Sequence, residues 1–391
     1  MLRSIGQKIY QVASGSQATI IPTTFPEYTA PDHTWVSFPL TTWTDGFFAS
    51  ALYLLDTRAK LCRRQSEFDW VSLGRTWSTG LLALENIDPS NLDHDVGFLS
   101  YPFQKELLVN PANITAQNAI IKLAIVLANR FNPIVGCTRS WNTADPTNFQ
   151  VSDTRFHAVS LNNMMNLELL FVAADLTGNQ TFRDIAKTHA DTTIKNHFRP
   201  DGSTWHVVEY NSTTGIVIQK ITAQGYANNS TWTRGQSWAI YGYANMYNRT
   251  GLTQYLDTAR RAATLYVDRL PQDDIVPWDF DAPRPTTADT SSSTIAASGM
   301  LLLADMEENL FPPNYTGAAF WRQSAIKLLT ATNDFAWAPP SWQSLLSNGT
   351  VNNRADPPMN DTGIVYADHY WIEAGNRLIS NGLAPCPEVG L

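Results

Sequence analysis

Apolar residues recur at helical spacing along this chain, in segments that polar and proline-containing loops separate. The stretch 167–175 is the plainest case, because its leucine, phenylalanine, valine and alanine residues run directly toward Gly178. Glycine readily adopts the left-handed backbone conformation that ends a helix, so we predict that this helix ends there. The same pattern predicts helices over 46–61, 71–86, 116–130, 239–248 and 296–310, with Gly251 and Gly317 ending the last two.

A short motif occurs three times along the chain: Thr-Gly, then an aromatic residue four positions after the glycine, then alanine four positions further on. The copies begin at Thr177, Thr250 and Thr316, which are 73 and 66 residues apart. This spacing suits one helical hairpin with its loops, so 391 residues would hold about six hairpins. We therefore predict an all-α fold, an (α/α)6 barrel forming a single domain over 1–391, with long loops and short β-strands near 204–210 and 216–218.

Composition narrows the classes of function. The chain carries 27 Lys and Arg against 35 Asp and Glu, a net charge of −8, which argues against binding to nucleic acid. No run of eighteen apolar residues predicts a membrane span. Cys62, Cys137 and Cys386 are widely separated and form no CxxC pair, which argues against a metal cluster and leaves room for one disulfide and one free thiol. We predict no metal and no cofactor.

Asparagine sequons are a guide to the compartment. Nine asparagines have Ser or Thr two positions further on, which favours secretion through a glycosylating pathway, although a chain rich in Asn and Thr would produce some of them by chance. The first eight residues lack the apolar core of a signal peptide, so either the peptide has been removed or the protein is cytoplasmic. The sequons are at Asn113, Asn179, Asn211, Asn228, Asn229, Asn248, Asn314, Asn348 and Asn360.

The tract Gln224–Trp238 is the first candidate for chemistry. It combines two tryptophans and one arginine with many amide and hydroxyl side chains. Indole faces stack on sugar rings, amides and hydroxyls bond to sugar hydroxyls, and a guanidinium can hold a carboxylate through two parallel hydrogen bonds. In a chain of net negative charge, Arg234 would supply the local positive charge that an acidic sugar needs. The tract therefore predicts a pocket for an acidic sugar.

Other polar aromatic motifs each have an ordinary structural explanation when taken alone. Asp45 before a glycine could cap a helix, and His94 with Asp95 could be a hydrogen-bonded loop pair. His206 could be a core histidine, and Asn162 could simply start a helix. Trp232, Arg234 and Trp238 share one helix face and could form a structural cation–π stack.

Their combination and order are specific. Together they resemble the unsaturated glucuronyl hydrolases of glycoside hydrolase family 88, over about residues 43–373, and members of that family are (α/α)6 barrels. The motifs that carry the resemblance are Trp43-Thr44-Asp45-Gly46-Phe47, His94-Asp95-Val96-Gly97-Phe98, Asn163-Met164-Met165-Asn166-Leu167, Gln224-Gly225-Tyr226-Ala227, Arg234-Gly235-Gln236-Ser237-Trp238 and Tyr366-Ala367-Asp368-His369-Tyr370.

The resemblance implies an unusual hydrolysis. The substrate is a lyase product with a nonreducing-terminal 4,5-unsaturated uronate, and the enzyme hydrates the C4=C5 bond; the resulting hemiketal opens and releases the rest of the molecule. One carboxyl group that donates and then accepts a proton is sufficient, and a second can stabilise positive charge. In the family both are aspartates: one corresponds to Asp95, and the other to position 162.

Position 162 is the main departure from the family pattern. The family reads Asp-Asn-Met-Met-Asn where this chain has Asn162 first, and an amide cannot exchange a proton at useful acidity. Asn has nearly the shape of Asp, so binding can survive without turnover. A deliberate Asp→Asn substitution that traps substrate is the favoured explanation, and a naturally inactive relative is the other.

The resemblance also implies the binding residues and the partner, an unsaturated uronyl oligosaccharide bound by a monomer or small homo-oligomer. Tryptophans would surround the sugar, whereas polar side chains would bond to its hydroxyls and its C5 carboxylate. Because glycans at Asn228 or Asn229 would crowd this pocket, we predict that both sequons are empty. The tryptophans are Trp43, Trp141, Trp232 and Trp238, and the polar residues are His94, His206, Gln224 and Arg234.

Three alternatives stay open. In a polysaccharide lyase of the same barrel, Asn162 would neutralise the uronate while His206 or Tyr226 removes the C5 proton. The neighbouring unsaturated rhamnogalacturonyl hydrolases usually read Arg-Gly-Asn-Gly-Trp where this chain reads Arg-Gly-Gln-Ser-Trp from Arg234. A non-catalytic sugar-binding relative is the third, and Asn162 is its support.

Overall fold

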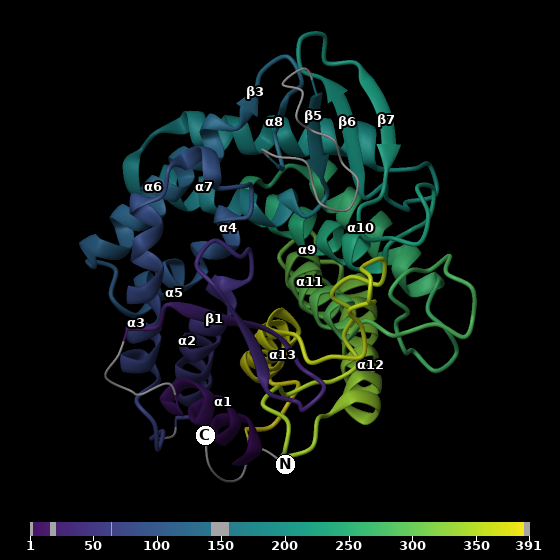
Figure 1. The fold of residues 1–391 in the computed structure, drawn as a ribbon. Coiled ribbons are helices and arrows are strands. Elements are labelled where there is room, and N and C mark those ends of the chain that lie inside the picture. The colour runs from purple at the N-terminus through teal and green to yellow at the C-terminus, as the bar shows by residue number, and fades with distance from the viewer. Residues whose placement is uncertain (1–2, 16–20, 64, 142–155, 387–391) are drawn as a thin grey trace.

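A computed structural model describes residues 3–15, 21–63, 65–141 and 156–386. Helices dominate the described chain, and the strands are few and short (Figure 1). The helices are α1 (Arg3–Gly15), α2 (Asp45–Leu61), α3 (Trp70–Leu81), α4 (Val96–Leu99), α5 (Tyr101–Val109), α6 (Ile114–Asn129), α7 (Asn163–Thr177), α8 (Gln180–His197), α9 (Thr233–Thr250), α10 (Thr253–Asp268), α11 (Thr290–Glu308), α12 (Tyr315–Ala336) and α13 (Val365–Ser380), with short 3-10 turns η1 (Leu82–Asn86) and η2 (Pro89–Asn91).

The helices form a closed double ring. In the inner ring α7, α9, α11, α13 and α2 pack against each other in that order, and α4 and α5 complete the circuit between α2 and α7. Outside them, α3 packs on α2, α6 on α5 and α7, α8 on α7, α10 on α9, and α12 on α11. The predicted (α/α)6 barrel is confirmed.

Burial explains the two rings. Almost every residue of α11 is buried, including five consecutive Thr and Ser side chains at its start, because the helix is enclosed by neighbours on all sides. The outer helix α10 buries one face only, which includes Tyr255, Ala259 and Tyr266. An inner helix therefore lacks the apolar stripe that usually marks a helix in sequence, whereas an outer helix shows it.

The glycine assignments are confirmed at two of three places. Gly178 and Gly251 follow α7 and α9 with φ of 73° and 68°, in the left-handed region. Gly317 was expected to end a helix, and this was wrong: it lies in the first turn of α12, where its N–H is capped by the Asn314 side chain. The helix before it, α11, has already ended at Glu308. The third copy of the motif thus starts a helix at the place where the other two end one.

The strands form three small antiparallel sheets. β1 (Thr24–Thr29) pairs with β2 (Trp35–Pro39), and β3 (Phe131–Asn132) pairs with β4 (Cys137–Thr138). The third sheet has the order β5 (Phe156–Ser160), β6 (Val207–Asn211), β7 (Val217–Ile221). The strands predicted near 204–210 and 216–218 correspond to β6 and β7, joined by a turn in which Gly215 has φ of 71°.

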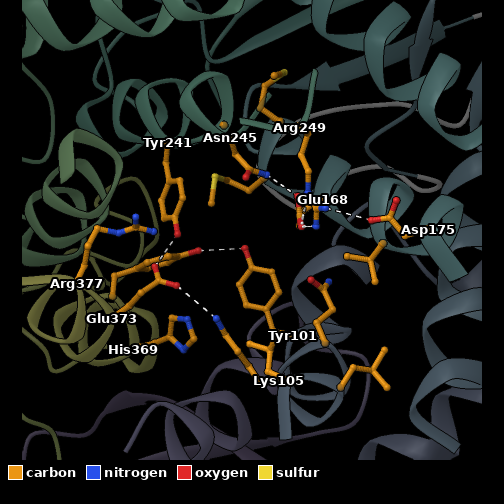
Figure 2. A pocket seen from close by; sticks show the side chains of 18 residues that line it. Tyr101, Lys105, Glu168, Asp175, Tyr241, Asn245, Arg249, His369, Glu373 and Arg377 are labelled. Atoms are coloured by element: carbon orange, nitrogen blue, oxygen red, sulfur yellow. Dashed lines mark hydrogen bonds and ion pairs between the residues drawn. The ribbon is translucent and has the colours of Figure 1, made fainter. Parts of the chain in front are cut away.

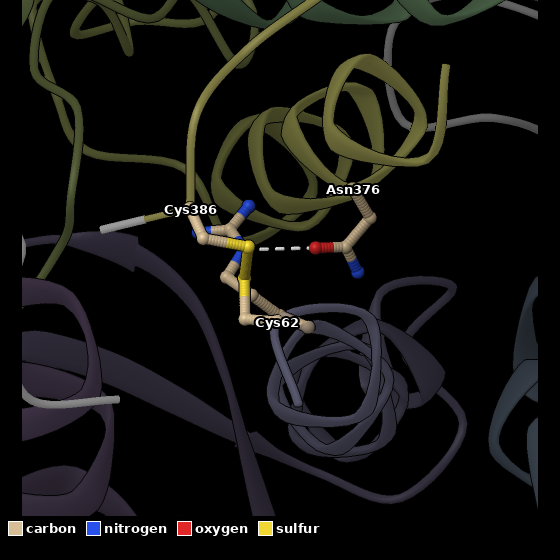
Figure 3. The surroundings of a disulfide bond; sticks show 4 residues. Cys62, Asn376 and Cys386 are labelled. Atoms are coloured by element: carbon tan, nitrogen blue, oxygen red, sulfur yellow. Dashed lines mark hydrogen bonds between the residues drawn. A yellow bond between two sulfur atoms is a disulfide. The ribbon is translucent and has the colours of Figure 1, made fainter. Parts of the chain in front are cut away.

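One disulfide joins regions that are distant in sequence. Cys62, directly after α2, is bonded to Cys386, beyond α13, across 324 residues (Figure 3). Next to it, Arg58 donates to the side chain of Asn376 and to the Ile372 carbonyl. The bridge therefore fastens the first inner helix to the last. Cys137 is a buried free thiol, and within the described segments no helix is long and apolar enough to cross a membrane.

Candidate functional site

The predicted site residues gather where the inner helices begin. Trp43 lies just before α2, Asp95 before α4, Asn162 before α7 and Trp232 before α9. Ring contacts show that these ends meet: Trp43 lies 4.7 Å from Tyr366 in the first turn of α13 and 5.6 Å from a phenylalanine of α4, measured between ring centroids. We call this end of the barrel the N-terminal face.

The buried His94 and the partly exposed Asp95 form a pair on this face. His94 Nδ1 lies 2.9 Å from the Ser140 carbonyl oxygen, which can only accept, so this nitrogen carries the proton. Burial lowers the pKa of His94 to about 4, so its ring is neutral and Nε2 is an acceptor. Nε2 lies 3.3 Å from Asp95 Oδ1, and the two atoms can hydrogen-bond only when Asp95 is protonated. Burial raises the pKa of Asp95 to about 7, which is consistent with that state.

Asn166 connects Asp95 to Asn162. Its side-chain oxygen accepts the N–H of Phe98 at 3.0 Å, and its amide nitrogen lies 3.4 Å from the Asn162 carbonyl oxygen. A hydrogen bond from Asn166 also lowers the pKa of Asp95, although burial outweighs it. A side chain at Gly97 would come within 2.3 Å of Asn166, so glycine is needed for this close approach of α4 and α7. The helix starts that carry the two predicted catalytic positions are thereby held side by side.

Asn162 itself has an unsatisfied atom. Its side-chain oxygen is buried and has no hydrogen-bond partner in the described structure. Unpaired buried polar atoms are costly, and in native proteins they concentrate where a ligand or water completes the bonding. A carboxyl group here would face the same space, but the amide cannot give or take a proton at this position.

His206, just before β6, provides a donor. Its Nδ1 accepts the backbone N–H groups of Ala223 at 3.3 Å and Gln224 at 3.4 Å, so the proton lies on Nε2. Burial lowers the pKa of His206 well below its usual value, and the nearby Arg234 lowers it further. Nε2 is buried without a partner. The neutral ring thus presents one unused N–H.

The structure corrects the expectation for Arg234. Its side chain is 1% exposed, and its guanidinium donates to Asp289 at 2.6 Å and to the carbonyl oxygens of Thr350 and Val351 at 2.6 and 2.8 Å. Its positive charge is therefore paired inside the protein and does not supply the free local charge that the sequence suggested. Arg234 instead ties α9 to the start of α11 and to the loop that precedes α13.

Two tryptophan expectations also change. The Trp232 ring is covered by two side chains. The His206 ring stacks on it with the ring centroids 4.1 Å apart, and the Arg234 guanidinium lies 4.6 Å from the ring centroid. Trp238 is fully buried and packs against Phe98. Both indoles are therefore buried inside the protein, at 3% and 0% exposed.

Trp43 and Trp141 differ, since both are partly exposed on the N-terminal face. Trp141 packs edge-on to His94, with ring centroids 5.8 Å apart. Gln224 is half-buried and donates to the Val351 carbonyl at 2.9 Å. Of the other predicted site residues, Asp95 and Asn162 are also partly exposed.

Sequence reasoning assigned no role to two residues that the structure places here. Tyr366, whose motif contributed to the resemblance, is buried against Trp43, and its hydroxyl lies near the Ser291 side chain. Arg354 is exposed, and its guanidinium lies 3.3 Å from the Thr222 carbonyl, close enough to His206 to lower the pKa of that ring. Nothing in the local sequence marks Arg354, because a loop from a distant part of the chain brings it to the site.

Known proteins resemble this chain over most of its length. The chain matches no protein-family model. It is 33% identical over 353 residues to the unsaturated glucuronyl hydrolase of Formosa agariphila, covering 87% of this chain and 80% of that protein. The chain therefore belongs to the unsaturated glucuronyl hydrolase family.

Solved structures of unsaturated glucuronyl hydrolases have the same fold. The crystal structure of the enzyme from Bacillus sp. GL1, described as responsible for the degradation of glycosaminoglycan, matches with a TM-score of 0.84 at 25% identity, over 98% of this chain and 97% of that one. A second, specific for heparin, matches with a TM-score of 0.83 at 28% identity, over 97% and 96% of the two chains. The likeness to these unsaturated glucuronyl hydrolases spans both rings of the barrel and the loops of the N-terminal face.

Proposed function

We propose that this unsaturated glucuronyl hydrolase scaffold acts on lyase-generated oligosaccharides that end in a 4,5-unsaturated uronate, and that the N-terminal face binds that sugar. The observation that carries the proposal is a pair of buried polar atoms on this face that have no protein partner in the described structure: Nε2 of His206 and the Asn162 side-chain oxygen. A sugar ring would offer hydroxyls that satisfy them, since a hydroxyl both donates and accepts.

The binding roles follow from the geometry. Trp43 and Trp141 have exposed indole surface for stacking on sugar rings. Arg354 is the exposed cation near His206, and we assign it the uronate carboxylate in place of the paired Arg234. The N-terminal ends of the inner helices add partial positive charge at this face.

The proposed chemistry is hydration of the double bond. A group at position 162 would protonate C4 and take a proton from the water that attacks C5, while Asp95 stabilises the developing positive charge. Asp95 must be ionised for that role. With its pKa near 7, a bound substrate that gains positive charge would favour the ionised form.

Asn162 divides binding from turnover. Because the amide cannot perform either proton transfer, we propose that this chain holds the unsaturated sugar and does not convert it. Asn162→Asp would restore the missing step, since general acid–base catalysis contributes roughly 10²- to 10⁴-fold. Loss of the double-bond absorbance measures it: a hydrolase removes this chromophore, whereas a lyase creates it.

A second candidate is a sugar-binding protein that has lost catalysis altogether, and Asn162 is the observation that favours it. Calorimetry with an unsaturated disaccharide separates the two. Both predict binding to the unsubstituted chain, but only the hydrolase scaffold would convert the disaccharide after Asn162→Asp. An Asn162→Asp protein that binds and stays inactive would favour the binding protein.

Substrate identity and compartment belong to the same proposal. One solved relative is named as specific for heparin and another as acting in glycosaminoglycan degradation, so unsaturated disaccharides of that class are the first to test. Secretion is supported by the Cys62–Cys386 disulfide, because such bonds persist in oxidising compartments.

A further inference from the structure

A cavity lies inside the barrel, away from the N-terminal face. It has a volume of about 390 Å³ and is lined by residues of α5, α7, α9 and α13 (Figure 2). Small-molecule sites usually fall between roughly 300 and 1,000 Å³, so this space is large enough for a ligand of a few rings at most. We call it the inner cavity.

An aromatic layer separates the two sites. Phe47, Phe98 and Trp238 are fully buried. Phe47 and Phe98 contact Trp43 at the N-terminal face, Trp238 packs on Phe98, and all three also contact residues that line the inner cavity. Phe98 lies 5.6 Å from Tyr101, and Trp238 lies 5.6 Å from Tyr370, between ring centroids. A ligand of the inner cavity would therefore be distinct from the sugar proposed for the N-terminal face.

The charges of the inner cavity are internally paired. Lys105 lies 3.6 Å from Glu373, and Arg249 is bonded to Glu168. A third cation, Arg377, is paired with Asp305 at 2.6 Å. An ionic ligand would have to displace one of these partners, so a neutral ligand suits the cavity better.

Other groups favour a ligand rich in hydroxyls. His369 is fully buried at the cavity wall, where one of its ring nitrogens faces the Phe47 backbone carbonyl and burial lowers its pKa to about 4. The ring is therefore neutral, and its other nitrogen is an acceptor to which a ligand hydroxyl can donate. Beside it, the Tyr101 and Tyr370 hydroxyls share only a long contact of 3.3 Å.

The wall is also aromatic. Tyr101 lies nearly parallel to His369, at 25° and 5.8 Å, and Tyr241 packs against Tyr370 at 5.8 Å. Aromatic rings beside unused hydrogen-bonding groups are the combination that binds the two faces of a sugar ring. We propose that the inner cavity is a second carbohydrate site, which binds a neutral monosaccharide.

The test is a titration of the full chain with glucose, galactose and rhamnose, followed by calorimetry and by saturation-transfer NMR. We expect saturable binding of at least one sugar with a millimolar dissociation constant, and no displacement by sodium sulfate. His369→Phe keeps the ring and removes both nitrogens, and should weaken binding at least tenfold. Trp43→Ala, on the N-terminal face, should leave this binding unchanged.

Several results would overturn the proposal. One is that none of the three sugars binds saturably up to about 100 mM, and another is that sulfate displaces the bound sugar. A third is that Trp43→Ala loses sugar binding while His369→Phe keeps it. If His369→Phe does not fold, Gln104→Leu decides, because Gln104 lines the same cavity from a half-buried position. Unchanged affinity in Gln104→Leu would then place the sugar elsewhere.

Discussion

Asp289→Asn should be strongly destabilising, because it would leave a charged arginine unpaired inside the barrel. Asp289 Oδ2 accepts from Arg234 at 2.6 Å, and both side chains are almost completely buried, at 0% and 1% exposed. Removing one partner of a buried ion pair typically costs about 3–5 kcal/mol. Asp289 also caps α11 by accepting the Ser291 N–H, and asparagine caps a helix equally well. The substitution therefore measures the loss of the ion pair separately from the loss of the helix cap. The expected loss is therefore about 3–5 kcal/mol in the free energy of unfolding.

Urea unfolding followed by circular dichroism measures this loss. Asp273→Asn is the matched control: Asp273 is exposed, accepts only a backbone N–H among the bonds found, and should change stability by less than about 0.5 kcal/mol. Arg234→Met with Asp289→Asn should recover part of the loss, since the double variant leaves no buried charge. A loss below about 1 kcal/mol for Asp289→Asn would refute the reasoning, because that is the size expected of an exposed ion pair.

Three further predictions concern the Cys62–Cys386 disulfide, the Asp95 carboxyl group and the glycans. Replacing Cys62 and Cys386 by serine should lower the free energy of unfolding by about 2–5 kcal/mol and the melting temperature with it; equal melting of both proteins would contradict this. Burial raises the pKa of Asp95 to about 7 from an unfolded value near 3.9, so its contribution to stability is intact below about pH 4 and is lost as the pH rises to 7. Asp95→Asn should therefore gain up to roughly 4 kcal/mol over the parent protein between pH 4 and 7, and a difference that does not vary with pH would count against the raised pKa. Peptide mapping of secreted protein should find Asn228 and Asn229 unglycosylated, and an occupied site would count against a pocket at this face.

The helical content and the barrel could be predicted because helix ends carry local chemistry. Gly178 and Gly251 ended helices as expected, since the left-handed conformation is a property of the residue itself. Gly317 did not, because the side chain of Asn314 caps the start of a new helix there. The inner helix α5 was missed altogether; its short span of nine residues carries little periodicity.

The sequence assigned Asp95, Asn162 and His206 to one predicted site, but it could not show how the surrounding side chains are paired. In the structure each of the three directly precedes an inner helix or a strand at the N-terminal face. Local sequence does not show that Asp289, 55 residues further on, neutralises Arg234. Nor does it show that the loop carrying Arg354 returns to the site. Such pairings depend on which loops lie next to each other in space. That arrangement is set by the closure of the helical barrel.

The central claim is that position 162 alone separates binding from turnover. The most direct measurement compares this chain with its Asn162→Asp variant on one unsaturated disaccharide, following absorbance of the C4=C5 bond and affinity by calorimetry. The account predicts similar affinity for both proteins and an absorbance decrease at least about 100-fold faster in the variant. Adding Asp95→Asn to the variant should remove the gained activity. Tight binding with no gain in rate, or a rise in absorbance, would contradict the account.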